Sequence, residues 1–369
     1  MTRVSIRSDD FLIDGVVANL GRTVGGIRVD GLLINSRMIN GIFDDLNPET
    51  RDQWAYPGTG VWDPERNTDE FIAAMPQWRA DGLDAFTIGV QGGSPQGYSK
   101  KQPWDSGGYE PDGSLRYAHF ARLRRILDAA DALGLVVILD LFYQGQEMRL
   151  TDDEAVRRAV SGTVAWVLEG GWENIVIEIA NECNIPHEYT HSRLMRGENV
   201  HELIELVRST ERDGRRLLVS SSFVDASHFR RTEPGSVFVT PEVLRAADLV
   251  IIHGNGTRFP GRLKELADET RATQGWRPMP IVVNEDDHFD FDRVDNHMMV
   301  ALRDHVSWGY FDPGSATTWP DPKPTLGDYE NGFQAVPVNW GPSSPLKREF
   351  FAAIRDDARS SHPEPAQKG

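Results

Sequence analysis

Two segments of the chain consist of a run rich in β-branched residues that ends in Asn-Glu. Residues 175–182 read Ile-Val-Ile-Glu-Ile-Ala-Asn-Glu, and residues 280–285 read Pro-Ile-Val-Val-Asn-Glu. Runs of this kind are typical of parallel strands that are covered on both faces. Each would place a carboxylate, Glu182 or Glu285, at the C-terminal end of a strand, where the active sites of α/β barrels lie. Paired carboxylates at such an edge suit acid/base and nucleophilic chemistry, as in the cleavage of a glycosidic bond.

Segments typical of strands and of helices alternate along the rest of the chain. The predicted strands lie, in chain order, at residues 38–43, 84–90, 135–141, 175–182, 216–220, 248–253, 281–284 and 308–311. Helical patterns separate them, as at residues 115–133. This alternation predicts an α/β protein with a parallel (β/α)₈ TIM barrel. An open doubly wound sheet is the alternative, but no Gly-x-Gly-x-x-Gly motif follows the first predicted strand.

The chain divides into three predicted regions. Residues 1–37 alternate short apolar segments with Gly, Asp and Asn, which predicts β-hairpins packed on the barrel and a turn at residues 35–37. Residues 38–358 would form the catalytic barrel, a length that single barrels commonly reach. Residues 359–369 are polar and contain Pro, which predicts a disordered tail.

The composition argues against several classes of partner. The formal net charge is −17, and both nucleic acid and anionic membranes would repel such a surface. Cys183 is the only cysteine, so neither an intrachain disulfide nor a cysteine-based zinc site is expected. The N-terminus lacks the apolar core of a signal peptide, and no stretch approaches the length of a membrane span. A cytoplasmic location is therefore expected, or a secreted one if a leader has been removed.

The segment around Glu182 carries a resemblance to a known superfamily. Side chains alternate along a strand, so Glu178 and Glu182 would share one face, with Glu182 at the mouth and Glu178 deeper as structural support. The run Glu178-Ile-Ala-Asn-Glu182, with Glu285 closing the seventh strand, resembles the clan A retaining glycoside hydrolases, the cellulase-like TIM barrels. The resemblance implies that Glu182 is the acid/base and Glu285 the nucleophile. It also implies that Asn181 binds the sugar 2-hydroxyl.

This resemblance covers the barrel but identifies no single family. Those proteins often carry a His after the third-strand Asp, whereas Asp140 is followed here by Leu-Phe-Tyr, and Cys183 stands where Pro is usual. The sugar, its linkage and exo or endo action stay open. The implied partner is a carbohydrate, either an oligosaccharide or a glycoside, and neither a cofactor nor a metal is expected. The sequence does not indicate an oligomeric state.

Further candidates for substrate binding lie near the predicted strand ends. The resemblance suggests His253 beside the nucleophile and Trp308 as an aromatic platform, since aromatic faces stack on the apolar faces of sugars. The alternative for His253 is a hydrogen-bonded histidine at the barrel rim, and the alternative for Trp308 is a residue of the core. Polar candidates on the catalytic face are Asp44, Asp45, Gln91, Tyr143, Asp286, Asp287 and His288. The alternative interpretation of each is a solvated loop residue that makes no contact with substrate. The acidic run at residues 286–292 is also compatible with a Ca²⁺ site or with a polar loop that leads into a helix.

Two other classes of function remain open from the sequence. Residues 187–191 match His-Glu-x-x-His, a zinc signature that requires both histidines on one face of a stable helix. Pro186 and the polar surroundings predict a loop instead. A metal-dependent barrel enzyme, such as a sugar isomerase, is one alternative. The other is a carbohydrate-binding barrel without turnover, against which the presence of both glutamates argues.

Overall fold

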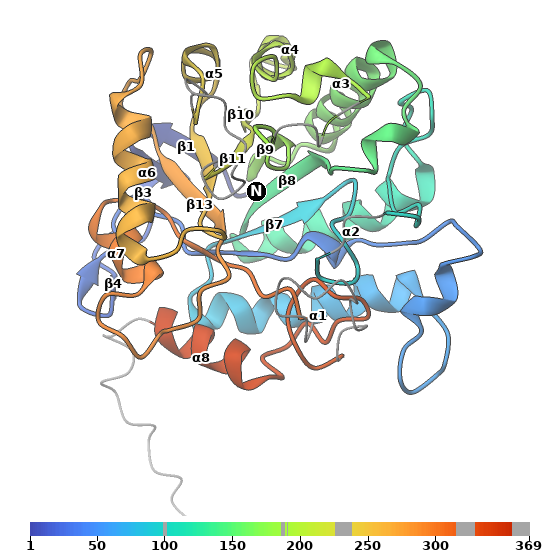
Figure 1. Ribbon diagram of the computed structural model, residues 1–369, viewed down its shortest axis with the longest axis horizontal. Coiled ribbons are helices and arrows are strands. Elements are labelled where there is room, and N and C mark those ends of the chain that lie inside the picture. Colours follow the sequence, from blue (N-terminus) through green and yellow to red (C-terminus); the bar gives the residue numbers. More distant parts are fainter. Residues whose placement is uncertain (99–101, 186–188, 190, 226–237, 315–328, 356–369) are drawn as a thin grey trace, which may run out of the picture.

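The computed structural model describes residues 1–98, 102–185, 189, 191–225, 238–314 and 329–355. Parallel strands lie at its centre, and helices surround them (Figure 1). The central strands are β6 Asn35–Arg37, β7 Ala85–Gly89, β8 Val136–Phe142, β9 Ile175–Ala180, β10 Leu218–Ser220, β11 Ser222–Val224, β12 Val250–His253, β13 Ile281–Glu285 and β14 Gly309–Tyr310. The α-helices are α1 Pro64–Asp81, α2 Tyr117–Leu133, α3 Asp153–Gly170, α4 His201–Ser209, α5 Pro241–Ala246, α6 Pro260–Ala272, α7 His297–Arg303 and α8 Pro345–Ile354.

The strands form two sheets that join into one barrel. One sheet has the order β10-β9-β8-β7-β6-β14 and the other the order β11-β12-β13. Only Ser221 separates β10 from β11, so these two act as one interrupted strand that pairs with β9 and with β12. On the opposite side, Val282 of β13 forms a parallel bridge with Ser307, next to β14. The protein is therefore a (β/α)₈ barrel, as the sequence predicts.

Local sequence signals set the helix boundaries. Asp152 caps α3 by accepting a hydrogen bond from the Ala155 amide at 2.8 Å. Gly134 ends α2 with a φ of 70°, a left-handed conformation that glycine adopts without strain. These boundaries fix where the next strand begins, and hence which residues lie at its C-terminal end.

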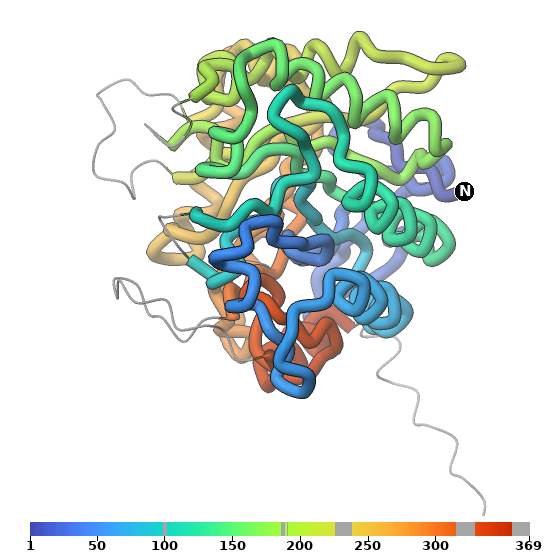
Figure 2. Tube along the Cα trace, turned by 90° about the vertical axis from the view of Figure 1, so that its right-hand side faces the viewer, coloured from blue at the N-terminus to red at the C-terminus, as the bar shows by residue number. Residues whose placement is uncertain are grey.

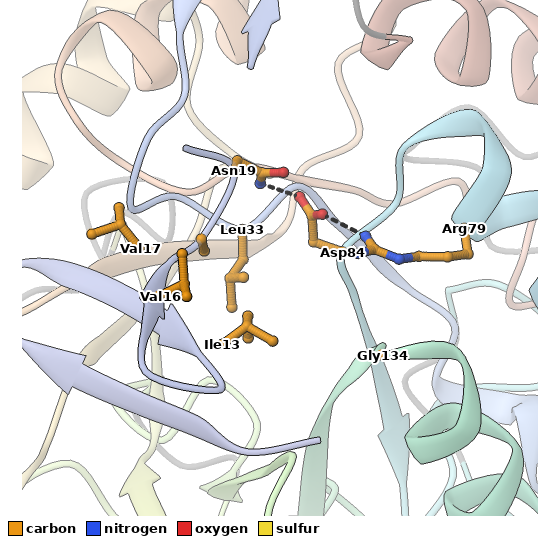
Figure 3. Close-up of a pocket in the computed structure, with 9 residues that line it drawn as sticks. Ile13, Val16, Val17, Asn19, Leu33, Arg79, Asp84 and Gly134 are labelled. Atoms are coloured by element: carbon orange, nitrogen blue, oxygen red, sulfur yellow. Dashed lines mark hydrogen bonds and ion pairs between the residues drawn. The ribbon is translucent and has the colours of Figure 1, made fainter. Parts of the chain in front are cut away.

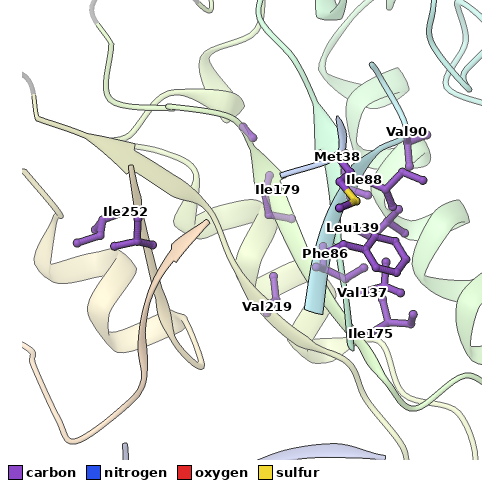
Figure 4. Close-up of a cluster of buried hydrophobic side chains, with 14 of the residues drawn as sticks. Met38, Phe86, Ile88, Val90, Val137, Leu139, Ile175, Ile179, Val219 and Ile252 are labelled. Carbon is purple, nitrogen blue, oxygen red and sulfur yellow. The ribbon is translucent and has the colours of Figure 1, made fainter. Parts of the chain in front are cut away.

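The outward-facing side chains of the strands form the main core. Figure 4 shows part of this cluster, including Phe86 and Ile88 of β7, Val137 and Leu139 of β8, and Ile179 of β9. All five are fully buried. Burial of each such side chain stabilises the fold by about 1.5–3 kcal/mol relative to exposure. The alternate side chains of these strands point into the barrel.

The N-terminal segment closes the end of the barrel at which the strands begin. Its strands are β1 Val4–Arg7, β2 Asp10–Ile13 and β3 Val16–Val17, which form an antiparallel sheet, and the hairpin of β4 Thr23–Val24 and β5 Ile27–Arg28. Phe11 of β2 packs in one cluster with Val136, Ile138 and Ile251 of the barrel. In Figure 2 this dark blue segment includes the chain start at the right of the molecule. The predicted N-terminal hairpins are confirmed.

A cavity of about 160 Å³ lies between this segment and the barrel (Figure 3). Asp84 lies at its edge and accepts hydrogen bonds from Asn19 at 2.6 Å and from Arg79 at 2.9 Å. Because Asp84 directly precedes β7, the cavity lies at the end of the barrel opposite to the two strand-end glutamates. It takes no part in the site described below.

The first barrel strand differs from its prediction. The sequence predicts a turn at residues 35–37 and a strand at residues 38–43, whereas residues 35–37 form β6 and Ile39–Gly41 form a short 3₁₀ helix. The polar side chains of this strand bond to neighbouring strands: the Asn35 amide donates to the Val283 carbonyl at 3.0 Å, and the Ser36 hydroxyl donates to the Tyr310 carbonyl at 3.1 Å. The apolar run that follows is buried without strand pairing.

Among the described residues, no helix combines the length and apolar character that a bilayer crossing requires. The predicted tail at residues 359–369 lies outside the described residues.

Candidate active site

Glu182, His253 and Glu285 meet at the C-terminal ends of their strands. His253 ends β12 and Glu285 ends β13, while Glu182 lies two residues beyond β9 with a φ of 47°. This left-handed backbone is uncommon for glutamate and is a strain typical of functional sites. His253 Nδ1 lies 2.9 Å from Glu182 Oε1 and 3.4 Å from Glu285 Oε2. One carboxylate oxygen of each glutamate and a His253 ring nitrogen all lie within 4.8 Å of one another.

Arg37 of β6 is the main cation of this site, and the sequence analysis missed it. Its Nε lies 2.7 Å from Glu285 Oε2, and its Nη2 donates to Asn181 Oδ1 at 2.6 Å. Its side chain is 1% exposed and lies 3.5 Å from Asp140 Oδ2. The buried guanidinium therefore connects the carboxylate of Glu285 to Asn181, the residue before Glu182. Its position in a segment with the composition of a turn concealed this role.

The surroundings of Glu285 and His253 set their charges. Asn255 donates to Glu285 Oε1 at 2.7 Å, so both carboxylate oxygens have a donor. Burial raises the pKa of Glu285 to about 7, although Arg37 and His253 act in the opposite direction. Burial lowers the pKa of His253, which favours its neutral form. A neutral ring with its proton on Nδ1 donates to Glu182.

A layer of buried polar residues lies below the glutamate pair. The Asn284 amide donates to Glu178 Oε2 at 2.7 Å, and Glu178 is fully buried and paired in register with Asp140. Burial and the charge of Glu178 raise the pKa of Asp140 well above its usual value. Glu178 thus occupies the deeper position that strand alternation predicts. Arg37, through Asp140, connects this layer to the mouth.

Two other predicted residues, Asn181 and Tyr143, are linked to the pair, and a third, Gln91, supports Tyr143. Asn181 accepts from Arg37 through Oδ1, and its Nδ2 donates to Gln144 Oε1 at 3.0 Å. Burial and the charge of Glu285 raise the pKa of the Tyr143 hydroxyl. Gln91 supports this residue by accepting a hydrogen bond from the Tyr143 amide at 3.2 Å.

The residues after Glu285 divide into a buried carboxylate and a partly exposed one. Asp286 is fully buried and accepts from Trp308 Nε1 at 2.8 Å and from His288 Nδ1 at 2.6 Å. Asp287 keeps 29% of its side chain exposed and accepts from the Tyr98 hydroxyl at 2.9 Å. Tyr98 comes from the loop after β7, and nothing in the local sequence indicates its place in the site.

Three further predicted ligands, Asp44, Asp45 and Trp308, are engaged by other side chains of the protein. Asp45 is fully buried and accepts from Thr50 at 2.6 Å and from Trp54 Nε1 at 2.8 Å, so it organises the loop that follows β6. Asp44 forms ion pairs with Arg51 of this loop at 2.8 Å and with Arg122 of α2 at 3.5 Å. The ring of Trp308 is fully buried in the core and has no face open to a sugar, contrary to its expected platform role. Contacts with neighbouring side chains orient each of these residues. The types of residue at the strand ends do not indicate those contacts.

Two groups of potential metal ligands lie at this end of the barrel. They are Glu182 with His253 and Glu285, and Asp286 with Asp287 and His288. In the first group the guanidinium of Arg37 already contacts Glu285, which disfavours a divalent cation at the same oxygen. Residues 187, 188 and 190 of the His-Glu-x-x-His motif lie outside the described residues. Tyr189, inside that motif, donates its hydroxyl to the Asn181 carbonyl at 2.7 Å.

Several solved structures that share this fold are glycoside hydrolases. A glycoside hydrolase family 5 enzyme from Prevotella bryantii matches 88% of this chain and 96% of its own, with a TM-score of 0.51 at 11% identity. An endo-1,4-β-mannanase from Rhizomucor miehei matches 83% of this chain and 89% of its own, with a TM-score of 0.50 at 12% identity. A β-glucuronidase from Bifidobacterium dentium matches 100% of this chain and 50% of its own, with a TM-score of 0.50 at 11% identity. No protein-family model and no curated protein matches the sequence. The chain has the (β/α)₈ barrel fold that family 5 glycoside hydrolases share.

Proposed function

We propose that the protein is a glycoside hydrolase that cleaves an O-glycosidic bond by a retaining double displacement. Glu182 is the acid/base and Glu285 the nucleophile. The observation that carries this proposal is the approach of the two carboxylates to within 4.8 Å around His253. Retaining enzymes hold their carboxyl groups about 5–5.5 Å apart and inverting enzymes about 6.5–9.5 Å apart. The separation of the Glu182 and Glu285 carboxylates therefore supports a mechanism that retains the anomeric configuration.

The surroundings of the two carboxylates suit these two roles. Arg37 and Asn255 donate to Glu285 and stabilise its ionised form, so that it can attack the anomeric carbon. As that bond forms and the glycosidic bond breaks, Glu182 gives its proton to the leaving oxygen. Glu182 then takes a proton from water, and the water oxygen displaces Glu285 from the anomeric carbon. Both carboxyls return to their initial protonation states.

The proposed substrate class is a β-glycoside. Among the structural neighbours, one is a 1,4-β-mannanase and another is a β-glucuronidase. A first screen therefore uses aryl β-glucosides, β-mannosides and β-glucuronides.

The stereochemistry of the first product tests the proposal. We expect the newly released sugar to have the same anomeric configuration as the substrate, because two displacements at one carbon restore it. Proton NMR during the first turnovers, before mutarotation equilibrates the anomers, measures this. The free sugar in the same buffer gives the rate of mutarotation as a control. Initial release of the opposite anomer would show inversion and remove Glu285 as nucleophile.

We also expect kcat/KM to fall on the acidic side of pH 7. The pKa of Glu285 is raised by burial to about 7, so this carboxyl gains a proton below that pH and can no longer attack. Activity should therefore rise with pH through about 7 on its acidic limb. The measurement is a pH profile of kcat/KM on an aryl glycoside with a good leaving group. A profile with no loss of activity below pH 7 would contradict the assignment.

A metal-dependent enzyme is the second candidate, because Glu182, His253 and Glu285 present ligand atoms close enough to share one ion. Metal analysis of the purified protein, with activity measured before and after chelation, separates the two. Glycosidase activity that persists after chelation supports the carboxylate mechanism.

A further inference from the structure

Asp287 is a partly exposed carboxylate held next to the proposed nucleophile. Its Oδ2 accepts a hydrogen bond from the Tyr98 hydroxyl at 2.9 Å, and 29% of its side chain is exposed. The neighbouring Asp286 is instead fully buried. Of these two acids after Glu285, only Asp287 is in a position to meet a ligand from the mouth of the barrel.

Tyr98 constrains the Asp287 carboxylate through this hydrogen bond. Its ring packs edge-on against Phe311 with centroids 5.8 Å apart. Burial and the charges of Asp287 and Glu285 raise the pKa of the Tyr98 hydroxyl, which also lies near Asn255. Asn255 in turn donates to Glu285. Asp287 and its tyrosine thus flank the carboxylate that would attack the anomeric carbon, where the ring hydroxyls of a bound glycone would lie.

The charge around this position is negative. Three consecutive acids, Glu285, Asp286 and Asp287, lie here. Within the described part of the chain, the cations that contact them are Arg37, engaged by Glu285 and Asn181, and His288, whose Nδ1 lies 2.6 Å from Asp286 but 3.8 Å from Asp287. A ligand carboxylate at Asp287 would therefore meet like charge, whereas sugar hydroxyls would find an acceptor.

We propose that Asp287, positioned by Tyr98, selects the glycone: it binds hydroxyls of an uncharged sugar and rejects a sugar that carries a carboxylate. This inference rests on the proposed glycosidase function. It gives Asp287 a role in specificity and leaves the bond-breaking steps to Glu182 and Glu285.

The test compares matched substrate pairs that differ in one charge. The pairs are an aryl hexoside and the aryl uronide of the same configuration, with the same leaving group, in the gluco, manno and galacto series. The wild type should favour the hexoside in kcat/KM by at least about 100-fold. Asp287→Asn should reduce that ratio by about 10-fold or more, because it removes the repulsion and weakens hydroxyl binding together. Asp292→Asn, which changes an exposed acid in the same loop, should leave the ratio unchanged.

A binding measurement keeps this inference separate from the proposed function. The melting temperature of wild type and of Asp287→Asn is measured with free hexoses and with the corresponding uronates. The neutral sugar should stabilise only the wild type strongly. Two results with turnover would overturn the selectivity role alone. One is a hexoside-to-uronide ratio of kcat/KM that Asp287→Asn does not change, and the other is a wild type that prefers uronides. Selective binding of hexoses without turnover of any glycoside would overturn the hydrolase proposal alone, and the absence of both turnover and selective binding would overturn both.

Discussion

Glu285→Ala should lower kcat by at least about 10⁴-fold on every glycoside that the wild type cleaves, the scale of loss when a covalent nucleophile is removed. The reason is specific to the geometry. Arg37 and Asn255 orient both oxygens of Glu285, and no other described carboxylate receives these same two donors. Steady-state kinetics on aryl glycosides measure the loss. A variant that keeps wild-type activity would refute the double displacement.

Two controls separate chemistry from folding in this experiment. Glu205→Ala makes the same substitution on an exposed face of α4 and should leave kcat unchanged. Azide added to Glu285→Ala should restore turnover in part, because the anion enters the space left by the carboxylate and attacks the anomeric carbon. The product would then be a glycosyl azide with the configuration opposite to that of the substrate, since only one displacement occurs. Rescue with the original configuration would mean that another group is the nucleophile.

Much of the barrel is predictable because its signal is repeated along the chain. β8, β9 and β13 are buried on both faces, so each appears in the sequence as an apolar run, and their alternation with helices predicts the fold. The positions of Glu182 and Glu285 follow from the same pattern, since both come directly after such runs. A strand made of Asn-Ser-Arg has no apolar run, and β6 was therefore not predictable in this way.

The rest of the site depends on tertiary contacts that local sequence does not record. Tyr98 belongs to a loop and reaches Asp287 only because β7 and β13 both end at the mouth. Trp308 precedes β14 and packs outward with Phe350, so a tryptophan near a strand is as compatible with the core as with a sugar platform. Asp45 shows the same limit for acids, because its partners Thr50 and Trp54 fix its direction.

Arg37→Met should both destabilise the protein and impair catalysis. The substitution leaves Glu285 and Asp140 buried without the guanidinium that contacts both. Removing one partner of a buried ion pair costs about 3–5 kcal/mol of unfolding free energy. The pKa of Glu285, which Arg37 now lowers, should rise further, so the acidic limb of the pH profile should move to higher pH. Urea unfolding and kcat/KM profiles measure the two effects.

The pH dependence of the stability loss identifies its cause. Carboxyls whose pKa rises in the folded variant take up protons as the pH falls, and protonation removes the unpaired charge. The difference in unfolding free energy between wild type and Arg37→Met should therefore be largest at alkaline pH and shrink as the pH falls through the raised pKa values. Arg7→Met, which alters an exposed arginine of β1, should show no such trend. A pH-independent loss would indicate a packing defect, and Arg37 would then have no electrostatic role in holding the two acids.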